Sequence, residues 1–171
     1  ALSPYGNTKQ ICEEIIRDTA AVSDWFNAVS LRYFNPTGAH GSGEIGELPL
    51  GVPNNLMPFI TQTAAGIREE LLVFGDDYET PDGTAVRDYI HVVDLAEAHV
   101  EALGRLLEKK QKANLEIFNL GTGHGYSVLD VIHSFEKTSG VKLPFRIVAR
   151  RQGDVPQMYA STRLANRELD W

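Results

Sequence analysis

The chain has 171 residues, of which 43% are hydrophobic and 23% charged, and its net charge at pH 7 is -7. This composition suits a globular protein with a substantial core, and the negative charge argues against a general nucleic-acid or anionic-membrane surface. No apolar run approaches the ~20 residues of a membrane-spanning helix. The single cysteine, Cys12, excludes an intrachain disulfide and fits a reducing compartment. We therefore expect a cytoplasmic protein in which Cys12 is a small buried hydrophobe.

Hydrophobic periodicity and turn residues predict helices and strands that alternate along the chain. Helices are expected over residues 4–22, 54–65, 94–110 and 127–140, with a last one starting at 161 or 162. Strands are expected over residues 28–34, 71–74, 86–92, 115–120 and 145–149. This alternation places the chain in the α/β class. Because the chain begins at Ala1 and stops at Trp171 inside what reads as an unfinished helix, we expect a preceding portion to be missing.

The first helix carries a candidate catalytic pair. Ser3 can cap it, and Pro4 suits its first position. Tyr5 and Lys9 are four residues apart, so a helix places both on one face. A neighbouring ammonium favours the phenolate and lowers the pKa of a tyrosine, which makes the pair a possible proton-transfer device. The alternative is an ordinary amphipathic helix with an exposed lysine.

Other features of the chain favour structural interpretations. Ile11, Cys12, Ile15 and Ile16 are spaced to form a buried stripe on the first helix. The long connection 37–53 is either a mobile segment that folds over a ligand or a surface excursion. The Gly-rich run 121–125 places its third glycine one position too early for a dinucleotide-binding turn, so we interpret it as a tight strand-to-helix turn. The 5 histidines lack metal-ligand spacing, so no metal is expected.

Five stretches, in this order, closely resemble the UDP-glucose 4-epimerase family of the extended short-chain dehydrogenase/reductase superfamily. They are residues 31–40 (LRYFNPTGAH), 53–58 (PNNLMP), 73–75 (VFG), 82–96 (DGTAVRDYIHVVDLA) and 119–123 (NLGTG). The resemblance implies the carboxyl-terminal part of a Rossmann-like enzyme with a smaller substrate-binding α/β domain. Residues 1–35 would end the dinucleotide-binding domain. Residues 36–171 would form mainly the UDP-sugar-binding domain with returns to the Rossmann sheet, and the amino-terminal Rossmann half would be absent from this sequence.

The resemblance also implies an activity, the NAD-dependent interconversion of UDP-galactose and UDP-glucose in galactose metabolism. Tyr5 would be the base, Lys9 would bond the nicotinamide ribose, and Tyr33 would contact the nicotinamide end of NAD. A homodimer is expected for the longer parent enzyme, and no turnover is expected from these 171 residues alone. A nucleotide-sugar dehydratase or decarboxylase of the same superfamily, and a non-catalytic sugar-nucleotide-binding module, remain open alternatives.

The family's substrate contacts map onto polar and apolar positions along the chain. The helix start at 54–56 corresponds to a diphosphate contact, the strand 72–74 to a uracil contact, and Arg87 to a diphosphate clamp. Met158 stands where the family sets the pocket size for N-acetylated sugars. The expected substrate-binding residues are Asn35, Asn54, Asn55, Leu56, Leu72, Val73, Phe74, Arg87, Arg151, Asp154 and Met158.

Overall fold

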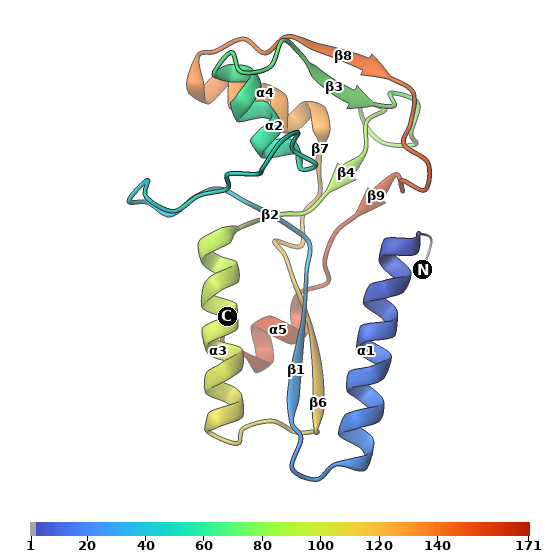
Figure 1. Ribbon diagram of the computed structural model, residues 1–171, viewed down its shortest axis with the longest axis vertical. Coiled ribbons are helices and arrows are strands. Elements are labelled where there is room, and N and C mark those ends of the chain that lie inside the picture. The colour runs from blue at the N-terminus through green and yellow to red at the C-terminus, as the bar shows by residue number, and fades with distance from the viewer. Residues whose placement is uncertain (1–2) are drawn as a thin grey trace.

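The computed structural model describes residues 3–171 as an elongated α/β chain with two parts (Figure 1). The lower part in this view is built on helix α1 (Pro4–Val22), strand β1 (Ala28–Tyr33), helix α3 (Val92–Leu107), strand β6 (Leu115–Leu120) and helix α5 (Arg163–Glu168). The upper part contains helix α2 (Leu56–Ala64), strand β3 (Leu71–Phe74), helix α4 (Val128–Ser139) and strand β8 (Phe145–Val148). The predicted α/β class is confirmed.

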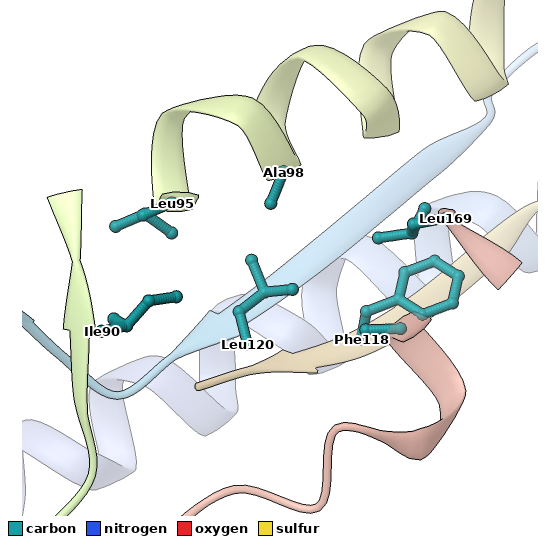
Figure 2. Close-up of a cluster of buried hydrophobic side chains, with 7 residues drawn as sticks. Ile90, Leu95, Ala98, Phe118, Leu120 and Leu169 are labelled. Atoms are coloured by element: carbon teal, nitrogen blue, oxygen red, sulfur yellow. The ribbon is translucent and has the colours of Figure 1, made fainter. Parts of the chain in front are cut away.

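The lower part is organised around the parallel pair β1–β6, which is in register from Ala28↔Leu115 to Tyr33↔Leu120. Helices α1 and α3 flank this pair on opposite sides (Figure 1). Its core lies on the α3 and α5 side (Figure 2). There, buried apolar side chains of α3, β6 and the α5 region meet one from strand β5 (Tyr89–His91). These side chains are Ile90, Leu95, Ala98, Phe118, Leu120, Ala165 and Leu169.

The upper part has its own core between α2, α4 and the parallel pair β3–β8. That core contains Ile60, Leu71, Val73, Ile132 and Leu143. Short strands join the two parts: β2 (Asn35–Thr37) pairs with β5 (Tyr89–His91), and β4 (Val86–Arg87) lies between β7 (Tyr126–Ser127) and β9 (Gln157–Met158). The joining strands therefore come from four separate stretches of the chain.

Local sequence signals set most element ends. The predicted helix 4–22 is confirmed, and Ser3 caps it by accepting a hydrogen bond from the Gly6 N–H at 3.1 Å. The predicted ends of α4 are also confirmed. Ser127 and Asp130 form a reciprocal capping box, and Gly140 ends the helix with φ 72°, a conformation that favours glycine.

Several predicted boundaries are wrong. The second helix begins at Leu56 rather than 54, and the third ends at Leu107 rather than 110. The strand expected over 86–92 is two strands, β4 and β5, because Asp88 between them turns its carboxylate inward to backbone donors. The third helix begins at Val92, and His91 rather than Asp94 is its cap, accepting the Val93 N–H at 3.2 Å. The last helix ends at Glu168 rather than continuing to the end of the chain.

The apolar stripe of α1, formed by Ile11, Cys12, Ile15 and Ile16, was predicted to be buried. This prediction is wrong for three of the four residues. Ile11 is 45% exposed and Ile15 60%, and Cys12 is also exposed, while Ile16 is half-buried. Of the helix residues, Ala20 alone is fully buried. The apolar spacing of α1 is real, but no segment within residues 3–171 covers that face.

Candidate functional site

The Tyr5/Lys9 pair lies near the amino-terminal end of α1. The Lys9 Nζ is 5.4 Å from the centroid of the Tyr5 ring, and the Tyr5 side chain is 72% exposed. The predicted sharing of one helical face is therefore confirmed. The exposed Tyr5 phenol is therefore accessible to a ligand, with the Lys9 ammonium close to its ring.

A cavity of about 450 Å³ lies in the upper part of the molecule, where β2, α2, β3 and β4 converge with the segment that precedes β9. Its volume is in the range of small-molecule binding sites. It brings together most of the residues that the sequence assigned to substrate binding: Asn35, Asn54, Asn55, Leu56, Leu72, Phe74, Arg87, Arg151 and Asp154. These residues come from separate stretches between positions 35 and 154, so the fold brings the stretches together.

Two arginines give the cavity its positive charge. The Arg87 Nη1 donates to the Val86 carbonyl at 2.7 Å, and its Nη2 forms an ion pair with the Asp154 carboxylate. The Arg151 guanidinium lies over the Phe74 ring, 4.0 Å from the centroid. Forked guanidinium donors match phosphate oxygens in geometry as well as charge. The cavity therefore suits a ligand that combines phosphate groups with a flat ring.

The start of α2 adds a second feature that favours anions. Asn55 is the cap residue but its side chain makes no capping bond, and its Nδ2 instead donates to Glu47 Oε1 at 2.9 Å. The first turn contains no acidic residue. The N–H groups of Leu56 and Met57 therefore point out of the helix end without an intrahelical acceptor, which is the arrangement that binds phosphate at helix starts.

Some expected site residues lie outside this cavity. The Val73 side chain is 1% exposed and packs in the core of the upper part, because it points away from Leu72 and Phe74 on the same strand. Met158 is 47% exposed in β9 and is paired with Arg87 across the strands. Tyr33 is half-exposed at the carboxyl end of β1. The structure thus separates these residues, and the Tyr5/Lys9 pair, from the cavity lining.

The cavity also contains residues that sequence reasoning did not assign to binding. Tyr89 lines it, and burial raises the pKa of Tyr89 to about 12 against the opposing effect of Arg87. Its hydroxyl therefore stays neutral at physiological pH. The remaining lining residues that were not assigned to binding are apolar, and they are Pro36, Val52, Pro53, Met57, Phe59, Leu71, Ala85 and Val128. The one available signal was their proximity in sequence to the motif residues.

The Gly-rich run after β6 holds a protein carboxylate. The N–H groups of Thr122 and Gly123 donate to the two Asp88 carboxylate oxygens at 2.8 and 3.0 Å. A Cβ on Gly121 would lie 2.4 Å from Asp88 Oδ2, so a side chain has no room there. These contacts support the interpretation of the run as a turn. Across the described chain, no cluster of three metal-ligating side chains occurs, and no helix has the length and apolarity to span a membrane.

Fold and site together define a partial extended short-chain dehydrogenase/reductase with a cavity suited to a phosphorylated ligand. Residues 1–121 match the model of the NAD dependent epimerase/dehydratase family, and the chain belongs to this family. It is 57% identical to the UDP-glucose 4-epimerase of Homo sapiens over 169 residues, which is 99% of this chain and 48% of that protein. The chain therefore spans about half the length of the curated relatives it matches.

Solved structures agree with this relationship. The UDP-glucose 4-epimerase of Stenotrophomonas maltophila, crystallised with NAD and formylated UDP-arabinopyranose, matches with a TM-score of 0.93 and 54% identity over 99% of this chain and 49% of that one. The Bifidobacterium longum enzyme, in complex with NAD+ and UDP, also gives a TM-score of 0.93, at 49% identity and the same coverage.

Proposed function

We propose that this chain works as the carboxyl-terminal part of a UDP-glucose 4-epimerase, which interconverts UDP-galactose and UDP-glucose by transient oxidation at the sugar 4-position. The observation that carries the proposal is the cavity in which Arg87, Arg151 and the start of α2 meet. The relatives that resemble the chain over 99% of its length bear this enzyme's name, which supports the proposal.

Different cavity residues would bind different parts of the sugar nucleotide. Arg87, Arg151 and the N–H groups at the start of α2 would bind the diphosphate. The strand residues 72–74 would border the uracil, with Leu72 and Phe74 offering side chains and Val73 only its backbone. The Asp154 carboxylate would accept hydrogen bonds from the ribose hydroxyls, and Asn35 would hold the sugar end of the ligand.

The Tyr5/Lys9 pair would perform the proton transfer. The Tyr5 oxygen takes the proton of the sugar 4-hydroxyl as hydride leaves, and returns it after the flat ketone has turned over. The Lys9 ammonium, which lies 5.4 Å from the centroid of the Tyr5 ring, would bond the nicotinamide ribose. NAD, when bound, supplies the hydride acceptor and donor. Tyr33 fits such a cofactor because it ends β1 at the carboxyl edge of a parallel pair, where α/β folds bind ligands.

We also infer the domain division and the assembly. Residues 1–35 would belong to the dinucleotide-binding domain, to which β6, α3 and α5 return, and the rest of 36–171 would form the UDP-sugar-binding domain. The exposed apolar face of α1, with Ile11 and Ile15, supports a parent chain in which further residues or a second copy cover this helix. A cytoplasmic homodimer is the form that we propose.

A product analysis of the full-length enzyme tests this function. With NAD present, UDP-galactose should convert to UDP-glucose, and the reverse, until both reach equilibrium. A keto sugar formed from either substrate with loss of water would instead assign the dehydratase activity. UDP-glucuronate, offered as a third substrate, tests the decarboxylase alternative, which would release carbon dioxide from its carboxyl group and leave a UDP-pentose. Binding of UDP without any product would assign the non-catalytic module.

A further inference from the structure

Asp88 is a fully buried carboxylate in the break between β4 and β5. Its Oδ1 accepts hydrogen bonds from the Thr122 N–H and hydroxyl at 2.8 and 2.7 Å. Its Oδ2 accepts the N–H groups of Gly123 and Ala160, both at 3.0 Å. A buried carboxylate is costly unless its oxygens are occupied, and here four neutral donors occupy them.

The backbone of Asp88 joins two more segments. Its N–H donates to the Met158 carbonyl at 3.1 Å, and its carbonyl accepts the Asn35 N–H at 3.0 Å. One residue therefore connects β2, the turn after β6 and the end of β9. Two of these segments carry residues of the proposed site. Asn35, in β2, lines the cavity, and Met158, in β9, lies two residues before Ala160.

The inward direction of Asp88 also decides where its neighbours point. Successive side chains in an extended segment lie on opposite faces. With Asp88 directed into the turn, Arg87 and Tyr89 are both directed to the other side, where they line the cavity. Asp88 itself does not line the cavity, so it can act on a ligand only through these neighbours.

We infer that Asp88 is a positioning residue for the binding cavity. Its carboxylate anchors residue 88 to the turn after β6 and to Ala160, in the segment that follows Asp154 and Met158. This anchor sets the positions of Arg87 and Tyr89, and of Asn35 through the Asp88 backbone carbonyl. This inference rests on the proposed function, since it concerns the affinity of the cavity for a nucleoside diphosphate. Catalytic and binding groups lose much of their effect when displaced by about 1 Å.

The test is Asp88→Asn in the full-length enzyme, with UDP binding measured by titration calorimetry. The carboxamide keeps the shape of the side chain but turns one acceptor into a donor that faces N–H groups. We expect the Kd for UDP and the KM for UDP-galactose to rise about tenfold or more, with kcat reduced less than about threefold. A purely structural role would lower the unfolding temperature and leave the Kd of the folded protein unchanged.

Asp82→Asn is the matched control. The Asp82 carboxylate likewise accepts bonds from protein donors, the Thr84 N–H at 2.9 Å, the Thr84 hydroxyl at 2.8 Å and the Ser127 hydroxyl, but it does not line the cavity. This variant should lose stability and keep its Kd for UDP within about twofold. Equal Kd changes in the two variants would overturn the inference.

Gly121→Ala is a second variant that should displace the Asp88 carboxylate. Its added Cβ would meet Asp88 Oδ2 at 2.4 Å and the Ala160 Cβ at 2.8 Å, so the carboxylate must move while its charge remains. This variant should also weaken UDP binding. If Asp88→Asn does not fold, an unchanged Kd in Gly121→Ala overturns the inference. Absence of UDP binding by the unaltered enzyme would refute the proposed function, whereas normal binding by both variants would refute only the role of Asp88.

Discussion

Replacing Arg105 with methionine should strongly destabilise the protein, although Arg105 lies outside the hydrophobic cores. Arg105 is 8% exposed and ties three elements together. Its Nε and Nη2 donate to the Glu116 carboxylate at 2.6 and 2.9 Å, and its Nη1 donates to the Glu168 backbone carbonyl at 2.7 Å. Arg105→Met removes all three bonds and leaves the Glu116 and Glu168 carboxylates, 11% and 12% exposed, without their buried cation. Removing one partner of a buried pair costs roughly 3–5 kcal/mol, a large share of a typical stability of about 5–15 kcal/mol.

Urea denaturation of the full-length protein measures this loss, and Arg146→Met is its control. Arg146 pairs with Glu70, but both side chains are largely exposed, at 59% and 41%, so solvent screens this pair and the variant should lose much less stability than Arg105→Met. Adding Glu116→Leu to Arg105→Met should recover part of the loss, because the uncompensated buried charge is then removed as well. Similar small losses for Arg105→Met and Arg146→Met would refute this reasoning.

Further predictions concern acid, sugar selectivity and the isolated chain. The hydrogen bonds from Arg105 hold the pKa of Glu116 below its usual 4.5, so the stability from this contact is present above that pH and is lost as the pH falls through the lower folded-state pKa. The urea midpoint of the unaltered protein should therefore drop more on acidification than that of Glu116→Gln, and parallel drops would contradict this. Met158→Tyr should reduce turnover of N-acetylhexosamine nucleotides about tenfold and spare UDP-galactose, whereas equal losses on both substrates would disprove a selectivity role. Residues 1–171 expressed alone should show no NAD-dependent turnover, and any measurable turnover would refute the need for further chain.

The elements that sequence predicted well depend on local interactions. The caps at Ser3 and Ser127 and the helix end at Gly140 use donors and acceptors within a few residues, so their patterns are visible in the chain. The break at Asp88 was not predictable in this way. The donors that turn its carboxylate inward come from Thr122, Gly123 and Ala160, which are distant in sequence.

Periodicity predicts which faces are apolar but not what covers them. The stripe on α1 has the predicted spacing, yet Ile11 and Ile15 are exposed within the described residues. For the candidate site, the family resemblance gave the expected substrate-binding residues, and the fold places most of them around one cavity. Strand alternation alone could have predicted that Val73, between two cavity residues, would be buried.

The central claim is tested most directly by Tyr5→Phe in the full-length enzyme, with turnover of UDP-galactose and the Kd for UDP measured together. Phenylalanine keeps the ring and removes the oxygen that would carry the proton. We predict a fall in kcat of about 100-fold or more, with an unchanged Kd, because Tyr5 does not line the cavity proposed to bind UDP. Turnover that stays within about threefold of the unaltered enzyme would contradict the assignment of Tyr5 as the base.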